Sequence, residues 1–277
     1  MTSRCDRALD RAGQLAREWN AELVVAYVAE HVHAPPYHLD RPRRSWRRLP
    51  DPLERMRWRL ERDLAGALAG MRVIVTEGNP AAKLAEIAAR EGCDLIVTGS
   101  AQGDSVERMF MGSTVNRLVR LALSPILMVQ DRCRQPYRNV TVATDFSDTS
   151  LRALCTASAF FPDARLTLFH AYDVPFSGLV ASVNLAGELR SAEREVTAKF
   201  LADTRVDPAL RQNARIVMEH GVPEVLLGDF AEDNHMDLTV IGSHGRGAAF
   251  DVLIGSTAKR MVETLEGDLL IVRHRGG

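Results

Sequence analysis

The residues best suited to chemistry in this 277-residue chain lie in one glycine-rich stretch near its C-terminal end. The stretch reads GSHGRG from Gly242, and nine residues separate Gly245 from the sequence Gly255, Ser256 and Thr257. A glycine just after a strand lets a ligand approach the backbone, because no Cβ stands in the way. A Gly-Ser-Thr sequence that opens a helix offers unpaired N–H groups and the positive end of the helix dipole. The pattern therefore predicts a site for phosphate.

A carboxylate is expected at the same place. Asp145 ends the apolar run NVTVATD, which is typical of a buried parallel strand. In open α/β sheets ligands bind at the carboxyl ends of the strands. The carboxylate of Asp145 would suit ribose hydroxyls there. The helix dipole alone contributes about 0.3–1 kcal/mol, so several contacts must act together.

The histidines near this stretch have simpler explanations than catalysis. We expect His244 to be solvated or to face phosphate, and His170 to be a hydrogen-bonded core residue at a strand end. The histidines at 31, 33 and 38 do not have the spacing of a zinc site. No carboxylate pair or acid–base group is placed to activate water, so we assign no catalytic residue and no metal ligand. Efficient hydrolysis of a bound ligand is therefore not expected, and any hydrolysis would be slow.

An internal repeat organises the whole chain. The glycine after one strand, Gly242, matches Gly99 at an offset of 242 − 99 = 143. The same offset relates Gly221 to Gly78, and the Gly-Ser-Thr sequence at 255 to the one at 112. We infer a first domain at 1–130, a linker at 131–138 and a second domain at 139–277.

Strands and helices alternate in each copy. In the second copy the patterns predict strands at 139–145, 164–171, 214–219, 237–241 and 268–272, and helices at 151–161, 183–204, 223–234 and 256–265. Such alternation predicts right-handed crossovers and a parallel sheet covered on both faces. The fold class is α/β, with two tandem open sheets.

The first copy lacks its first strand. When Arg7, Ala8 and Leu9 are aligned with RAL at 152–154, Met1 falls beside Phe146, beyond the expected strand. That strand would lie at the centre of the sheet, and its loss would outweigh the 5–15 kcal/mol that stabilises a typical domain. We expect the native start to lie roughly ten residues earlier, which an intact mass would test.

These residues carry a family resemblance. The pattern Gly-x2-Gly-x9-Gly-Ser resembles the ATP-binding signature of universal stress proteins, and ATDFS, LFHAYD and GVPEVLL are similar to that family's other conserved stretches. The resemblance covers nearly the whole chain in two copies. It implies a Rossmann-like (adenine nucleotide alpha hydrolase-like) five-stranded parallel sheet per domain, with the domains pairing through their last strands.

The resemblance also implies how ATP, with Mg²⁺, would be held in the second domain. Asp145 would contact the sugar, and the main chain of Ala171, after His170, would contact the base. The phosphates would lie against Gly242, Gly245, Gly255, Ser256 and Thr257.

The first copy departs from the pattern. Gln102 stands where the second glycine belongs, Tyr27 replaces the histidine, and the strand that would carry the aspartate is missing. A side chain at 102 would occupy the place of phosphate, so we expect this site to be weak or empty.

Charge and composition indicate which partners and which cellular location to expect. The net charge of −1 gives no overall attraction to nucleic acid or to an anionic membrane, and no stretch has the roughly 20 apolar residues of a membrane helix. The N-terminus has no signal-peptide pattern, and the four scattered cysteines indicate free thiols, so we expect a cytoplasmic protein. An arginine-rich loop at 41–48 is expected to be solvated.

The function expected is a stress-response protein whose shape or partner choice depends on ATP. Its protein partner is unknown, and both a monomer and a homodimer are open. One alternative is a scaffold of the same fold that binds no nucleotide. Another is an ATP pyrophosphatase-type ligase, which the sequence DFSD at 145–148 disfavours because no serine- and glycine-rich loop follows the first strand.

Overall fold

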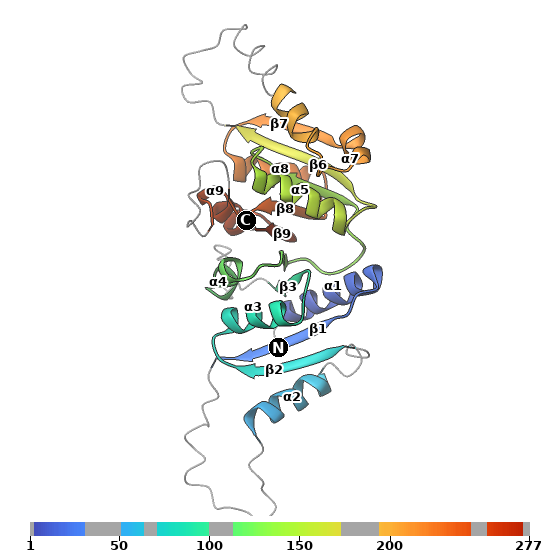
Figure 1. Ribbon diagram of the computed structural model, residues 1–277. Helices are drawn as coiled ribbons and strands as arrows, with labels where there is room; N and C mark the ends of the chain where they lie inside the picture. Colours follow the sequence, from blue (N-terminus) through green and yellow to red (C-terminus); the bar gives the residue numbers. More distant parts are fainter. Residues whose placement is uncertain are drawn as a thin grey trace, which may run out of the picture.

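The computed structural model describes residues 3–30, 51–63, 71–99, 113–172, 194–244 and 254–273. Two α/β halves lie end to end in Figure 1, and helices flank their sheets. The arginine-rich loop at 41–48 and the histidines at 31, 33 and 38 lie outside these residues.

The second half is a five-stranded parallel sheet, as predicted. Its strands lie in the order β9-β8-β5-β6-β7 and run parallel to their neighbours. The strands are β5 (Asn139–Ala143), β6 (Arg165–Tyr172), β7 (Arg215–His220), β8 (Leu238–Gly242) and β9 (Leu269–Val272). The helices are α5 (Asp148–Phe160), α7 (Pro208–Asn213), α8 (Pro223–Asp233) and α9 (Ser256–Thr264), and residues 194–201 are also helical.

One helix of the second half is absent from the sequence-based prediction. The helix expected at 183–204 ends at residue 201, and the short helix α7 follows it. The local signal was present, because Asp207 accepts a hydrogen bond from the backbone N–H of Ala209 (2.7 Å) and Pro208 begins the helix. An aspartate followed by proline is a standard helix start.

The first half repeats this order with one strand fewer. Its strands are β1 (Val24–Ala29), β2 (Arg72–Glu77), β3 (Ile96–Gly99) and β4 (Ile126–Val129), and its helices are α1 (Ser3–Trp19), α2 (Pro52–Asp63), α3 (Pro80–Arg90) and α4 (Ser113–Leu121). By chain order, β1, β2, β3 and β4 correspond to β6, β7, β8 and β9. Among the described residues, β5 has no counterpart in the first half.

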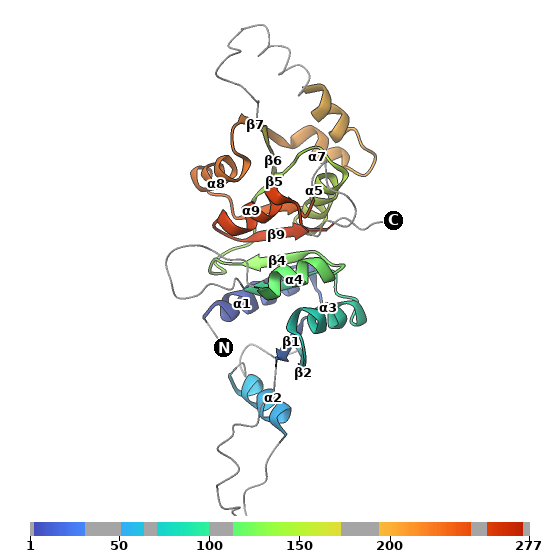
Figure 2. The ribbon, with the colours of Figure 1, turned by 90° about the vertical axis from the view of Figure 1, so that its left-hand side faces the viewer.

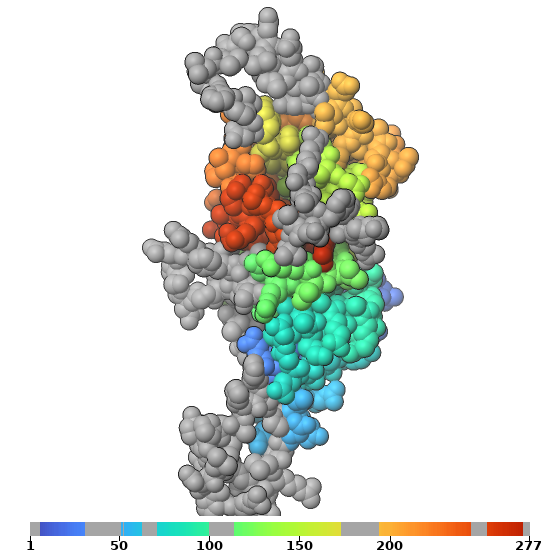
Figure 3. All heavy atoms as spheres, turned by 60° about the vertical axis from the view of Figure 1, so that its left-hand side comes forward, coloured from blue at the N-terminus to red at the C-terminus, as the bar shows by residue number. Residues whose placement is uncertain are grey.

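The two halves join through their last strands. β4 pairs antiparallel with β9, which makes one seven-stranded sheet in the order β3-β4-β9-β8-β5-β6-β7. Figure 2 shows these two strands side by side at the middle of the molecule, and Figure 3 shows the green residues of the first half directly beneath the red C-terminal segment. The pairing expected from the resemblance is confirmed.

The sheet of the first half is split where the missing strand would lie. β1 and β2 form a separate two-stranded sheet, and no described strand lies between β1 and β3, although β5 lies between their counterparts β6 and β8. All residues of β1 are only half-buried, whereas β6 has four buried residues. Helix α1 nevertheless packs on β3 and β4 as α5 packs on β8 and β9. The first half therefore keeps the frame of the second, with no described strand at the position that β5 holds in the second half.

Strand alternation divides the core of the joined sheet between two faces. Leu127 and Leu270 belong to a cluster under α1 and α5, whereas Ile126 and Ile271 belong to a cluster under α3, α4, α8 and α9. All four side chains are at most 3 % exposed. The core thus runs without interruption across the β4–β9 junction.

Candidate functional site

The predicted site residues of the second half that the structure describes lie around the point where the strand order reverses. From β5 the chain adds β6 and β7 on one side and then crosses to β8 on the other side. β5 is hydrogen-bonded to both β6 and β8 in parallel, so the carboxyl ends of these three strands share one edge. Asp145 follows β5, Gly242 ends β8 and Ala171 lies near the end of β6. Such a switch point forms a ligand crevice in open α/β sheets.

Asp145 lies in a turn that is fixed by its neighbours. The Thr144 hydroxyl accepts a hydrogen bond from the backbone N–H of Phe146 (2.9 Å), and the Asp145 carboxylate accepts one from the backbone N–H of Ser147 (3.1 Å). Phe146 has φ 60°, a left-handed conformation that is uncommon for a residue with a side chain. Ser147 then caps α5 by accepting from the N–H of Ser150 (3.2 Å). The carboxylate is half-buried beside the helix start.

His170 stabilises this turn from the adjacent strand. Its Nδ1 lies 2.6 Å from the carbonyl oxygen of Thr144, and its ring packs against Phe146 with centroids 4.5 Å apart. The expected hydrogen bond of His170 is confirmed, but the residue is half-buried rather than part of the core. Ala171 follows it with its side chain packed against the core, so its backbone is the part that can face a ligand at the edge.

Gly242 has a packing requirement of its own. A Cβ at this position would lie 2.9 Å from the Thr149 Cγ2 and 3.3 Å from that residue's backbone carbonyl. Helix α5 therefore approaches the end of β8 too closely for any side chain. The glycine that the sequence assigns to phosphate binding is thus also needed for helix–strand packing.

The start of α9 offers donors for an anion. Gly255 is the N-cap with φ −62° and ψ 148°, and no side chain caps the helix. The first-turn N–H groups, among them those of Ser256 and Thr257, have no acceptor within the helix. Ser256 is exposed and Thr257 half-buried. This end of the helix is suited to bind phosphate oxygens.

The N–H of Gly255 itself is already used. It donates to the carbonyl of Ser243 (2.9 Å), and the N–H of Ser243 donates to the carbonyl of Val272 (2.8 Å). The Ser243 hydroxyl lies 2.8 Å from Nδ1 of His244. These bonds hold the start of α9 against the ends of β8 and β9, a connection that the sequence analysis did not predict.

Charge near the site is balanced by an arginine. Arg205 pairs with Asp148, in the first turn of α5 (2.6 Å), and with Asp203 (2.9 Å). Hydrogen bonds from Arg205 hold the pKa of Asp203 at about 2 and also lower the pKa of Asp148. Both aspartates therefore carry their charge at neutral pH, with the arginine beside them.

Some predicted residues cannot be placed. Gly245, like the rest of loop 245–253, lies outside the described residues, as do Gln102 and Gly112 of the first half. Tyr27 lies in β1 and Gly99 ends β3, but the first half has no described strand between them to carry a carboxylate. In the described part of the chain, no three His, Cys, Asp or Glu side chains are grouped to hold a metal ion.

Comparison with known proteins identifies relatives of both halves. The model of the universal stress protein family matches residues 2–130 and again residues 136–273. A universal stress protein of Methanocaldococcus jannaschii is 30% identical over 144 residues, which cover 50% of this chain and 82% of that protein. Universal stress protein E of Escherichia coli K12 is 24% identical over 204 residues, which cover 66% of this chain and 61% of that protein.

Solved structures share the fold along the whole chain. A structure described as a putative universal stress protein from Pseudomonas aeruginosa covers 96% of this chain and 87% of its own, with a TM-score of 0.66 and 21% identity. A universal stress protein structure from Archaeoglobus fulgidus covers 99% of this chain and 95% of its own, with a TM-score of 0.63 and 16% identity. No helix in the described part of the chain is long and apolar enough to cross a membrane.

Proposed function

The chain belongs to the universal stress protein family, and from this premise we propose that it is a stress-response protein that binds ATP in its second domain. The observation that carries the proposal is the switch point, where the Asp145 carboxylate and the uncapped start of α9 lie at one edge of the sheet. We place the domains at 1–130 and 139–277, with the linker at 131–138.

Each predicted residue has a role in this proposal. The Asp145 carboxylate accepts hydrogen bonds from the ribose hydroxyls, and the main chain of Ala171 contacts the base. The phosphates lie against Gly242, Gly245 and the helix start, where backbone N–H groups and two hydroxyls donate to them. The residues at that start are Gly255, Ser256 and Thr257, and the contribution of Gly255 is a close approach rather than its engaged N–H.

Mg²⁺ enters the proposal as the counter-ion of the phosphates. Magnesium commonly keeps several waters and binds through one or two carboxylates and the substrate phosphates, so a dedicated protein cage is not required. It would neutralise phosphate charge at the start of α9. Binding, rather than hydrolysis, is the proposed activity, and it acts by favouring one shape or partner over another.

The cellular location and the oligomeric state are also part of the proposal. We propose a cytoplasmic location because Cys93, Cys133 and Cys155 are free thiols in the described part of the chain. Burial raises the pKa of all three, which disfavours a reactive thiolate. Pairing of β4 with β9 within one chain is compatible with a monomer, and a homodimer would use another surface.

The test is equilibrium binding of MgATP to the wild-type protein and to Gly245→Gln, which copies the first domain's Gln102. We expect a dissociation constant on the order of micromolar for the wild type and a loss of at least about tenfold in the variant. Ala21→Gln is the matched control, because it adds the same side chain at an exposed position remote in sequence from the site. Equal binding by Gly245→Gln and wild type would contradict the assigned site.

A scaffold without nucleotide is the second candidate function. It is favoured by the packing role of Gly242 against Thr149, because this part of the motif would be needed even if nothing were bound. The same titration separates the two functions. Absence of binding at millimolar MgATP by the wild-type protein would favour the scaffold.

A further inference from the structure

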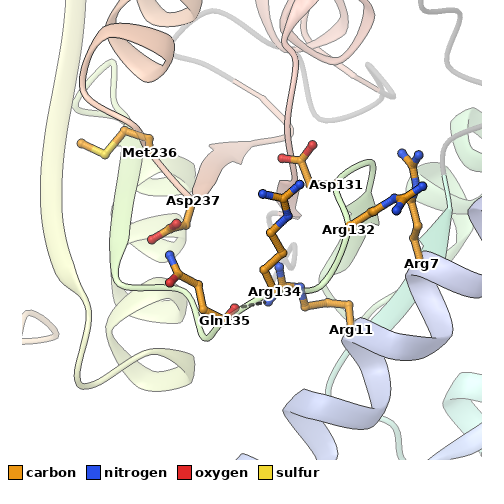
Figure 4. A pocket seen from close by; sticks show the side chains of 8 residues that line it. All are labelled: Arg7, Arg11, Asp131, Arg132, Arg134, Gln135, Met236 and Asp237. Atoms are coloured by element: carbon orange, nitrogen blue, oxygen red, sulfur yellow. Dashed lines mark hydrogen bonds between the residues drawn. The ribbon is translucent and has the colours of Figure 1, made fainter.

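A polar cavity lies between the two halves, away from the switch point. It has a volume of about 430 Å³ and is lined by α1, by the linker and by the residues that precede β8 (Figure 4). The linker leads into β5 and residues 236–237 lead into β8, so the cavity lies at the amino edge of the second sheet, opposite the candidate ATP site. Cavities of roughly 300–1,000 Å³ accommodate small molecules.

Arginine dominates the lining. Four of the eight lining residues are arginines and two are aspartates: Arg7, Arg11, Arg132 and Arg134 with Asp131 and Asp237. The Asp237 carboxylate is already engaged, because it accepts the backbone N–H groups of Arg138 and Asn139 (2.8 Å each). With all side chains charged, the lining carries four positive and two negative charges. The buried Asp268 carboxylate lies 3.5 Å from the Nε of Arg11 and offsets one of these positive charges. The other three arginines outnumber the two aspartates of the lining, which favours an anion, and three guanidinium groups supply donors for more than one phosphate.

Two of the arginines are exposed and have no ion pair within the described residues. These are Arg132 and Arg134, both from the linker. Arg7 lines the cavity with them (Figure 4), and its Nη1 donates a hydrogen bond to the carbonyl oxygen of Gln130. Because like charges repel, an anion bound among these guanidinium groups would stabilise the lining.

The side chain of Arg11, one of the lining residues, is buried and held by several contacts. Arg11 is only 4 % exposed, its Nη1 donates to the carbonyl of Gln135 (2.8 Å), and its guanidinium lies 4.1 Å from the ring centroid of Tyr137. Its Nε lies 3.5 Å from the Asp268 carboxylate, has no hydrogen-bond partner within the described structure and is buried. Asp268 in turn accepts the N–H groups of Gln130 and Asp131, which fixes the linker.

We propose that this arginine pocket binds a small anion with two or more phosphate groups and thereby fastens α1, the linker and the second domain to one another. Guanidinium groups donate pairs of parallel hydrogen bonds to phosphate oxygens, which suits this class of ligand. Among the described residues that line the pocket none is aromatic, so a nucleobase could stack only on guanidinium groups, whose paired N–H donors match phosphate oxygens better. Phosphate groups, rather than a nucleoside, are therefore the recognised part.

Calorimetric titration with pyrophosphate tests the proposal on the full chain. The variant Arg132→Ser with Arg134→Ser removes two exposed cationic groups. Its control is Arg55→Ser with Arg59→Ser, which removes the same charge from exposed positions on α2. We expect the pocket variant to bind pyrophosphate at least about tenfold more weakly and the control to bind as the wild type does.

Several results would overturn the proposal. They are no binding of pyrophosphate by the wild type up to about 10 mM, an equal loss in the control, or binding of AMP as tight as that of pyrophosphate. MgATP binding measured on the same variants keeps this proposal apart from the proposed function. Loss of pyrophosphate binding with MgATP binding intact supports a separate pocket, whereas loss of both would mean that the linker arginines serve the ATP site.

Discussion

At position 242 the neighbouring helix comes so close to the strand end that a methyl group has no room. The sequence predicts this glycine from its place in the motif, but the prediction assigns the space to phosphate. The structure shows that Thr149 of α5 fills part of it. Such a contact depends on how two elements pack in three dimensions, so the motif could predict the residue but not the physical reason for it.

Gly242→Ala should therefore destabilise the fold even without a ligand. Forcing a methyl group against Thr149 is expected to lower the free energy of unfolding by about 1–3 kcal/mol. Urea denaturation measures the change.

The control is Gly228→Ala, because a Cβ there would lie 3.7 Å from Leu265 in ordinary contact and would replace a glycine inside α8. We expect that variant to be neutral or to gain about 0.5–1 kcal/mol. Equal stability of Gly242→Ala and wild type would show that α5 can move away from the strand.

At the scale of elements, sequence patterns located the strands better than the segments between them. The sequences of buried strands such as β5 and β8 are continuous apolar runs. The repeat predicted the order of the strands along the chain. The turn after 201 and helix α7 were missed, since the periodic pattern of 183–204 extends beyond the point where the chain turns. The ion pair that joins this turn to α5, Arg205 with Asp148, links residues 205 − 148 = 57 positions apart, so no local pattern indicates it.

The cluster of Arg205 with Asp148 and Asp203 should make stability depend on acid pH. Asp203 has a folded pKa of about 2 against an ordinary 3.8, so the arginine favours its charged form. A depressed pKa contributes stability above the ordinary value, and this contribution disappears as pH falls from about 4 to about 2. Arg205→Gln should be less stable than wild type at pH 7, and the difference should shrink across that interval.

Chemical denaturation at several pH values, with carboxylate titration by NMR, measures both quantities. Arg165→Gln serves as the control, because Arg165 is exposed and has no ion pair in the described part of the chain. A difference between Arg205→Gln and wild type that stays constant from pH 5 to pH 2 would show that the arginine acts through packing rather than through these carboxylates.

For the whole molecule, the family resemblance predicted the pairing of the halves, and the repeat predicted that the first half has no counterpart of the second half's first strand. The offset of 143 residues relates every strand of the first half to one of the second, and the structure leaves the position equivalent to β5 open between β1 and β3. The arginine pocket could not be predicted in the same way. Its lining comes from three segments that approach only when the two halves are joined.

The lack of a described strand between β1 and β3 leads to a prediction about the whole fold. Joining a copy of the β5 sequence, residues 138–145, directly ahead of Met1 should supply a central strand, because the alignment places Met1 where Phe146 follows that sequence. Val140 and Val142 are fully buried in β5, and burying two such side chains stabilises by about 3–6 kcal/mol. We expect a higher melting temperature and slower amide hydrogen exchange in β1 and β3.

The matched control carries proline in place of both valines of the added copy. Proline cannot donate to the ladder of a central strand, so this fusion should gain nothing although its length and remaining sequence are the same. If both fusions stabilise the protein equally, the added segment acts without entering the sheet. If only the valine version slows exchange in β1 and β3 together, the two edges are bridged by one strand, since a segment bound at one edge would protect that edge alone.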